Sequence, residues 1–127
     1  MAVPFGCPRM SALATGLIAP HGGSLVDLMV PAAEREAVKA SATKAVECSD
    51  RNACDVELLV VGGFSPLRGF MHQQDYDAVV ASHRTSSGLL FGLPIVFDTS
   101  DPSIVIGDRL LLTYRGVDLA VFTVESK

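Results

Sequence analysis

Two glycine-containing stretches hold the residues best suited to chemistry in this chain. The first is Pro20-His21-Gly22-Gly23-Ser24, a polar turn followed by the apolar run 25–30. Successive backbone N–H groups in such a turn can cradle an anion, and His21 adds a titratable ring. The same residues equally suit a plain turn that leads into a strand over 25–30, because glycine is common in turns. The sequence leaves both interpretations open.

The second stretch is Gly62-Gly63-Phe64-Ser65-Pro66-Leu67-Arg68-Gly69-Phe70-Met71. Pro66 fixes its own φ and disfavours helix at the residue before it, while glycine permits backbone angles that other residues avoid. The bulky apolar side chains need burial, so we predict an ordered, packed turn. Arg68 is a candidate contact for phosphate or sulfate, or else a solvated cation or interface ion pair. The candidate interface or anion-contact residues are His21, Gly22, Gly23, Gly62, Gly63, Phe64, Ser65, Pro66, Arg68 and Gly69.

Other reactive side chains do not form a recognisable site. The three histidines lie at positions 21, 72 and 83, and the three cysteines at 7, 48 and 54, without metal-binding spacing or a Cys-x-x-Cys pair. No serine has a nearby histidine and acid, which excludes a local serine-hydrolase pattern. We therefore predict no metal site, no cofactor site and no catalytic residue in this chain.

Three helices are expected before any strand-rich region. A helix over 31–47 is favoured by Pro31 in its first turn, by early glutamates and by six alanines between 32 and 45. A second helix over 49–61 begins at Ser49 as N-cap and stops at Gly62, although its β-branched valines leave a strand as the alternative. Its predicted buried stripe consists of Cys54, Leu58 and Val61.

A third helix is expected over 73–83, and it begins after His72, a weak capping residue. Its apolar positions recur at helical spacing and predict a buried stripe of Tyr76, Val79, Val80 and His83. From residue 89 onward the pattern favours strands: an edge strand over 93–97 and a hairpin that joins 110–114 to 119–124. Helices followed by strands indicate an α+β fold.

Composition excludes several classes of protein. The chain has 127 residues, of which 49% are hydrophobic and 19% charged, as expected for one folded domain. Its net charge is −4 and its ten Lys and Arg residues are scattered, so we expect no nucleic-acid partner. No apolar run is long enough to span a membrane and no export signal is recognisable. Together with the odd cysteine count, this predicts reduced thiols and a cytoplasmic location.

Blocks of residues along most of the chain follow a distinctive order and spacing. They are Pro20-His21-Gly22-Gly23, Leu25-Val26-Asp27-Leu28, Cys54-Asp55-Val56-Glu57-Leu58, Gly62 to Met71, Asp75-Tyr76, Ser82-His83-Arg84, Gly88 to Asp98, Gly107-Asp108-Arg109 and Leu119 to Glu125. Together these blocks resemble the amino-terminal domain of ATP sulfurylases (sulfate adenylyltransferases). The resemblance implies such a domain over 19–127, after a loosely ordered extension over 1–18. It also implies a PUA-like pseudo-β-barrel with flanking helices, which we expect to be incomplete at its C-terminal end.

The resemblance further implies a role in sulfate assimilation. ATP sulfurylases convert ATP and sulfate to adenosine 5′-phosphosulfate and pyrophosphate, and their ATP and Mg²⁺ are handled by a following nucleotidyltransferase domain. The marks of that domain, Gln-x-Arg-Asn-Pro-x-His-x-x-His and Gly-Arg-Asp-His-Ala-Gly, do not occur here, since Arg51-Asn52 is followed by Ala53. We therefore expect an inactive scaffold that packs against the catalytic domain of the same polypeptide, in an enzyme that forms a homo-oligomer.

Two other functions remain as alternatives. PUA-like folds in other families bind RNA, so the chain is alternatively a free-standing binding module for RNA or protein, although its acidic balance weighs against RNA. A second alternative is a structural or regulatory relic without a catalytic partner. Independently of the function, the barrel that the resemblance implies needs further strands after the hairpin, so residues 119–125 are expected to form an unpaired apolar edge that favours association.

Overall fold

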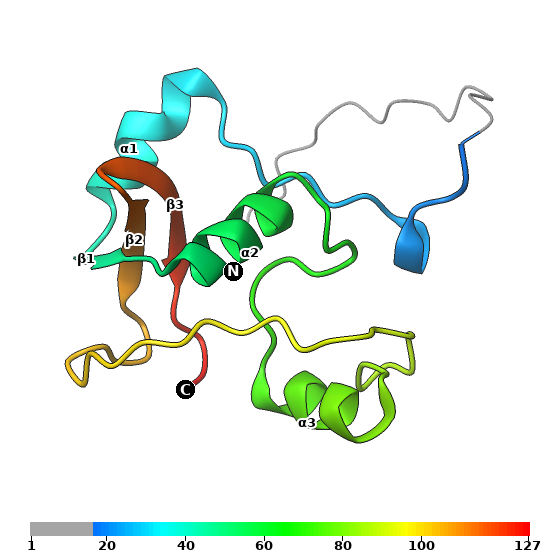
Figure 1. Cartoon of the computed structure of the whole chain (residues 1–127). Coiled ribbons are helices and arrows are strands. Elements are labelled where there is room, and N and C mark those ends of the chain that lie inside the picture. Colours follow the sequence, from blue (N-terminus) through cyan, green and yellow to red (C-terminus); the bar gives the residue numbers. More distant parts are fainter. Residues whose placement is uncertain (1–16) are drawn as a thin grey trace.

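The computed structural model describes residues 17–127, which form helices and one small sheet (Figure 1). The predicted extension over 1–18 lies, apart from Leu17 and Ile18, outside the described residues. Both of these side chains are exposed. In residues 17–127 no helix is both long enough and apolar enough to cross a membrane.

The sheet has three strands in the order β1-β2-β3. β1 (Lys44–Glu47) runs parallel to β2 (Arg109–Tyr114), and β2 runs antiparallel to β3 (Val117–Thr123). The predicted hairpin is confirmed, with a tighter connection than expected. Arg115 and Gly116 both have positive φ, 49° and 79°, as a two-residue turn between twisted strands requires.

The predicted helix over 31–47 is wrong in its second half. A 3₁₀ turn, η2 (Ala32–Glu34), and α1 (Arg35–Ala40) are followed by a turn and then by β1. Two contacts with the start of β2 and the residue before it explain the change: the Thr43 N–H donates to the Arg109 carbonyl at 2.7 Å, and the Lys44 ammonium pairs with Asp108 at 2.6 Å. Pairing along β2 outweighs the helix preference of alanines that have little apolar surface to bury.

The second predicted helix is confirmed as α2 (Asp50–Val60). Ser49 caps it, because its Oγ accepts a hydrogen bond from the Asn52 N–H at 3.2 Å. The predicted buried stripe is wrong, however, since the predicted residues Cys54, Leu58 and Val61 are all exposed. The face that packs inward consists of Asn52, Ala53, Val56 and Leu59.

The third predicted helix is confirmed as α3 (Gln73–Ser82), which ends at His83 in the left-handed conformation. His72 stands at its N-cap without a side-chain hydrogen bond to the helix, as expected for a poor cap. Instead its Nδ1 lies 2.8 Å from the Ser126 Oγ. The predicted stripe is largely wrong, because Val79 is buried whereas Tyr76, Val80 and His83 are exposed.

The strands expected over 25–30 and 93–97 are absent, although both segments are ordered. The Leu28 N–H donates to the Val60 carbonyl at 3.0 Å, and the Ile95 carbonyl accepts from the Met71 N–H at 2.8 Å. Single hydrogen bonds of this kind fix an extended chain without building a ladder. The α+β prediction is confirmed, and the sheet of the described residues stays open rather than closing into a barrel.

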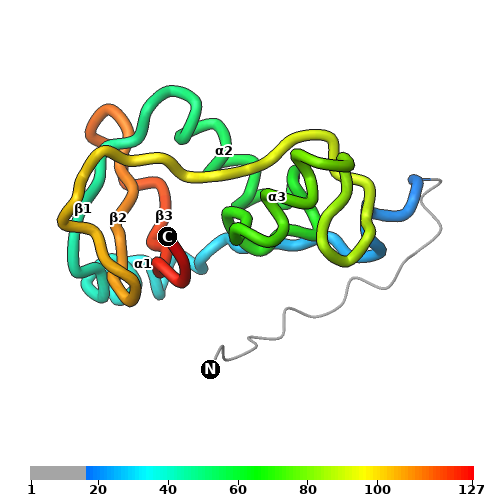
Figure 2. The backbone as a smooth tube through the Cα atoms, turned by 90° about the horizontal axis from the view of Figure 1, so that it is seen from below, coloured from blue at the N-terminus to red at the C-terminus, as the bar shows by residue number. Residues whose placement is uncertain are grey.

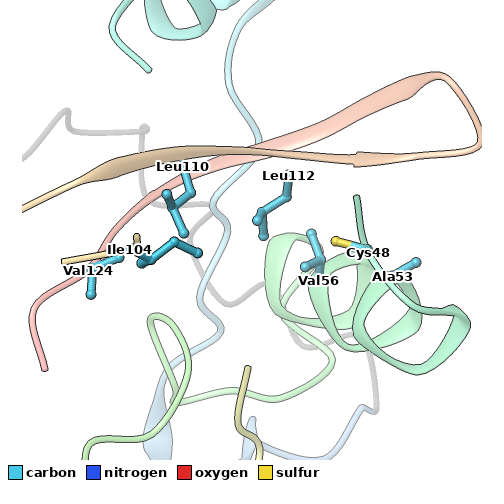
Figure 3. Packing of buried hydrophobic residues seen from close by; sticks show 7 residues of the cluster. All are labelled: Cys48, Ala53, Val56, Ile104, Leu110, Leu112 and Val124. Carbon is cyan, nitrogen blue, oxygen red and sulfur yellow. The ribbon is translucent and has the colours of Figure 1, made fainter. Parts of the chain in front are cut away.

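Two hydrophobic clusters form the interior. The first lies between α2 and the β2–β3 hairpin (Figure 3) and consists of Cys48, Ala53, Val56, Ile104, Leu110, Leu112 and Val124. The second lies under α3 and consists of Leu59, Met71, Val79, Phe91 and Ile95. Phe70 packs against both clusters. Figure 2 accordingly shows two lobes, one with the sheet and one with α3, joined by extended segments.

Candidate functional site

The two glycine-containing stretches meet in the folded chain, through the buried hydroxyl of Ser65. Its Oγ accepts a hydrogen bond from the Val26 N–H at 2.9 Å and donates to the Gly62 carbonyl at 2.7 Å. Segments 39 residues apart in the sequence are thereby tied together. A Cβ added to Gly62 would lie 2.2 Å from the Val26 carbonyl oxygen, so only glycine allows this approach.

The first turn also packs directly on the second. Gly22 has a φ of +70°, and a Cβ built on it would lie 2.6 Å from the Pro66 Cγ. The His21 Nε2 donates to the Leu90 carbonyl at 2.7 Å, and its ring centroid lies 6.3 Å from that of Phe91. We call this assembly the two-turn site, defined as residues 20–26, 62–69 and 89–91.

The end of α2 positions the second turn. The Gly62 N–H donates to the Leu59 carbonyl at 3.2 Å and the Gly63 N–H donates to the Leu58 carbonyl at 2.7 Å. These two bonds, with a φ of 83° at Gly62, form a Schellman motif. The same Gly62 motif that ends α2, as the sequence predicted, therefore also directs the second turn toward the first.

Apolar anchors hold the second turn against the α3 lobe, as predicted. Phe64 and Leu67 are half-buried against the second hydrophobic cluster. Arg68 is exposed and, within residues 17–127, forms no hydrogen bond or ion pair. Gly69, half-buried, and Gly23 have open space where a side chain would begin. Hence Phe64 and Leu67 have a structural role in the turn, whereas the Arg68 side chain remains available to contact another molecule or domain.

Two carboxyl groups with lowered pKa values, Asp108 and Glu47, lie in or beside the sheet rather than in the two-turn site. The Lys44 ammonium and then the Val105 N–H hold the pKa of Asp108 below its ordinary value. The Thr113 hydroxyl and the Arg115 N–H likewise lower the pKa of Glu47. These shifts follow from hydrogen bonds between β1 and the hairpin or its flanking loop, so we read them as structural rather than catalytic.

Two surface depressions lie on either side of α2. One, of about 470 Å³, is polar and is lined by Val46, Glu47, Ser49, Asn52, Asp98, Thr99 and Ser100. The other, of about 610 Å³, is mainly apolar, and we call it the α2–β3 groove. It is lined by Met29, Cys54, Val56, Glu57, Leu58, Val60, Val61 and Leu119. Sequence reasoning missed the groove because it assigned the stripe Cys54, Leu58 and Val61 to the core.

The predicted site residues thus separate into two groups. Gly22, Gly62, Ser65 and Pro66 are brought into contact, whereas Arg68 and Gly23 extend away from these contacts. His21 is committed to a backbone carbonyl, which suits a turn better than a base. Among residues 17–127 no group of three or more His, Cys, Asp or Glu side chains could hold a metal ion.

Comparison with known proteins places this geometry in a family. A family model described as PUA-like domain matches residues 18–127. The sulfate adenylyltransferase of Phaeosphaeria nodorum is 49% identical over 116 residues, which are 84% of this chain and 20% of that protein. That of Neurospora crassa is 48% identical over 88 residues, 67% of this chain and 15% of that protein.

A solved structure agrees with the sequence matches. The hexameric APS kinase from Thiobacillus denitrificans has a TM-score of 0.74 and 33% identity, over 84% of this chain and 23% of that one. The chain therefore spans about a fifth of the length of the relatives it matches. These matches confirm the resemblance to ATP sulfurylases that the sequence blocks indicated.

Proposed function

The chain belongs to the PUA-like domain family, and on this basis we propose that it is the non-catalytic amino-terminal domain of a sulfate adenylyltransferase. The parent enzyme would convert ATP and sulfate to adenosine 5′-phosphosulfate and pyrophosphate in sulfate assimilation. The observation that carries the proposal is the 49% identity to the Phaeosphaeria nodorum enzyme over 84% of this chain. In this proposal the domain acts as a scaffold for domain and subunit packing. Catalysis then takes place in the part of the enzyme outside this domain, about four-fifths of the length of the relatives.

The chemistry of the described residues supports an inactive domain. Adenylyl transfer needs several cationic groups and backbone donors aimed at phosphate oxygens, and usually Mg²⁺. At the two-turn site, however, Arg68 is the exposed cation, and the N–H groups of Gly62, Gly63 and Val26 are already bonded within the protein. The described residues do not fit a Mg²⁺ ion, so we assign ATP and Mg²⁺ to the catalytic domain of the same polypeptide.

The surface of the two-turn site suits packing against that catalytic domain. Leu25 and Leu90 both belong to this site: the Leu25 side chain lies beside Gly62, and the Leu90 carbonyl accepts the hydrogen bond from His21. Both residues are nevertheless largely exposed, at 67% and 55%. Apolar side chains beside a rigid turn and a free arginine match the composition of protein interfaces. Homo-oligomer formation and a cytoplasmic location belong to the same proposal, and the hexameric structural relative supports the former.

A pyrophosphate-release assay with ATP and sulfate tests the proposal. The 127-residue chain is compared with a chimera in which it replaces the matching part of the Phaeosphaeria nodorum enzyme. We expect activity from the chimera and none from the chain alone. Pyrophosphate release by the purified chain would overturn the inactive-scaffold role, and an inactive chimera would contradict the assignment to this enzyme. Tight, salt-sensitive RNA binding in a filter titration would favour a binding module instead.

A further inference from the structure

The polar depression beside α2 contains a buried oxygen atom without a hydrogen-bond partner in the described part of the chain. Asn52, on the inward face of α2, is only 3% exposed and lines this depression. Its side-chain N–H donates to the Asp98 carbonyl at 3.1 Å, whereas within residues 17–127 its Oδ1 accepts no hydrogen bond. Buried polar atoms of side chains normally have a partner, so this oxygen indicates a donor that comes from outside these residues.

The walls of the depression offer further acceptors and negative charge. Besides Asn52, they consist of three hydroxyl-bearing residues, two carboxylates and one valine: Ser49, Thr99, Ser100, Glu47, Asp98 and Val46. Among the described residues that line it there is no lysine or arginine. A ligand that matches these walls donates hydrogen bonds and carries positive charge.

Neighbouring cations do not neutralise the carboxylates of the walls. Glu47 accepts from the Thr113 hydroxyl at 2.6 Å and from the Arg115 backbone N–H at 2.7 Å, and both donors are uncharged. The Arg115 guanidinium lies instead 3.7 Å from a carboxylate oxygen of Asp50. Asp98 forms no ion pair with any residue of the range 17–127. Two carboxylates therefore remain available to a cation.

The N-terminus of α2, which by itself favours an anion, does not reverse this preference. The Ser49 hydroxyl already accepts the hydrogen bond of the Asn52 N–H, at 3.2 Å. Asp50 stands in the first turn, where its charge offsets the helix dipole. Because a helix end carries only about half a charge, the two carboxylates of the walls dominate and the depression favours a cation.

We propose that the polar depression binds a guanidinium group, with the Asn52 Oδ1 and the carboxylates of Glu47 and Asp98 as its acceptors. A guanidinium presents five N–H donors in one plane, which suits acceptors on several walls, and it is more weakly hydrated than an ammonium ion. A metal ion suits the site less well, since among residues 17–127 no group of three or more His, Cys, Asp or Glu side chains could hold one.

Size and surroundings agree with such a ligand. The depression measures about 470 Å³, within the range of small-molecule sites. Residues 98–100 on its rim are exposed and belong to no helix or strand, so this side can adjust until the ligand reaches the buried oxygen. The binding uses residues of this chain alone and does not depend on the proposed function.

An NMR titration of the isotope-labelled chain with N-acetyl-arginine amide tests the proposal. N-acetyl-citrulline amide, which is uncharged and of nearly the same shape, is the matched control ligand. We expect saturable shifts of the Asn52 side-chain amide with the arginine compound, and binding of the citrulline compound at least about fivefold weaker. Equal binding of the two compounds, or no shift at Asn52, would overturn the proposal.

Matched charge variants locate the ligand. Asp98→Asn removes a charge from the wall, whereas Asp77→Asn removes the same charge from an exposed position on α3. Asp98→Asn should weaken the binding of N-acetyl-arginine amide about two- to fivefold, as the loss of one exposed ion pair does, and Asp77→Asn should leave it unchanged. Equal affinities in these two variants would contradict binding in the depression. Both positions are exposed, so thermal unfolding should match that of the parent.

Asn52→Leu tests the buried oxygen itself. The side chains have similar volumes, but leucine offers no acceptor, so binding should weaken about tenfold or more, as for a lost hydrogen bond to a charged group. A well-dispersed NMR spectrum checks that the variant folds, and a folded variant with unchanged affinity would overturn the role of Asn52. If this variant does not fold, the comparison of Asp98→Asn with Asp77→Asn still decides the proposal.

The guanidinium group has two potential sources, a free compound or an arginine side chain of the same enzyme. Calorimetric titration of the chimera with N-acetyl-arginine amide distinguishes them. Affinity equal to that of the chain alone would assign the depression to a free ligand. Loss of binding in the chimera, after binding to the chain has been shown, would assign it to a side chain of the enzyme that already occupies it.

Discussion

At the scale of single residues, Ser65 decides whether the two turns stay together. Replacing it by alanine removes the acceptor of the Val26 N–H and the donor to the Gly62 carbonyl. Because Val26 is buried, its N–H would be left without a partner, at a cost of about 1–3 kcal/mol. Urea unfolding should show this loss for Ser65→Ala. Ser100→Ala, at an exposed position, should stay within about 0.5 kcal/mol of the parent; equal effects would contradict the role of Ser65.

Gly62 and Gly88 both need glycine for their positive φ, but only Gly62 also lacks space for a side chain. Both have positive φ, 83° and 87°, but an added Cβ meets the Val26 carbonyl at Gly62 and nothing within 4 Å at Gly88. Gly88→Ala should therefore cost only the left-handed conformation, about 1–2 kcal/mol. Gly62→Ala adds a backbone clash and should cost roughly twice as much or more, by thermal or urea unfolding. Similar losses would mean that the chain near Val26 moves aside freely.

The sequence located the residues of the two-turn site but not their contacts. Glycine and proline restrict their own backbone, so their turns can be predicted locally. The contact of Gly22 with Pro66 joins positions that are distant in sequence, and no local rule predicts it. Whether Arg68 contacts an anion or a partner domain stays a prediction.

At the scale of elements, the helices and strands marked by residues of their own segment were predicted correctly, and those that depend on distant partners were not. α2 has a capping serine and a stop glycine, and it was predicted correctly. The hairpin was also predicted, from its two apolar runs, but with a longer connection than the two-residue turn it has. β1 was missed because its alanine-rich surroundings favour helix, and only its pairing with β2 reveals a strand. The buried face of α2 was also missed. Burial depends on which neighbours a helix meets, and those neighbours lie far along the chain.

The attachment of β1 to the hairpin and its flanking loop should make stability depend on acid pH. The Lys44 hydrogen bond and the Val105 N–H hold the pKa of Asp108 below the 3.8 of an ordinary aspartate. A lowered folded-state pKa contributes stability above the unfolded value, and this contribution is lost as the pH falls through the folded pKa. Stability should therefore decline below about pH 4, and Asp108→Asn should make that decline shallower. Parallel curves of unfolding free energy against pH for the two proteins would contradict this role.

At the scale of the whole molecule, two hydrophobic clusters must behave as one folded unit. The first is built around α2 and the hairpin, the second around α3, and the elements themselves meet little across the boundary. Phe70 belongs to the surroundings of both clusters, and its ring lies 5.4 Å from that of Phe97 and 5.6 Å from that of Phe122. The sequence placed Phe70 in a packed turn, but the existence of two lobes follows only from the folded chain.

Phe70→Ala should therefore weaken the coupling between the lobes as well as the stability of each. Loss of a packed aromatic ring lowers the free energy of unfolding by about 3 kcal/mol. Phe122→Ala, which removes a ring from the first cluster only, should lower it by a similar amount.

The two variants should differ in the cooperativity of unfolding. In a Tyr76→Phe background, where Tyr114 is the one remaining tyrosine, removal of Phe70 should separate urea curves followed by fluorescence in the sheet from those followed by exchange of α3 amides, and the apparent m-value should fall. With Phe122 removed, the two probes should still coincide. Coincident transitions in Phe70→Ala would mean that the extended segments between the lobes, rather than this ring, make the domain cooperative.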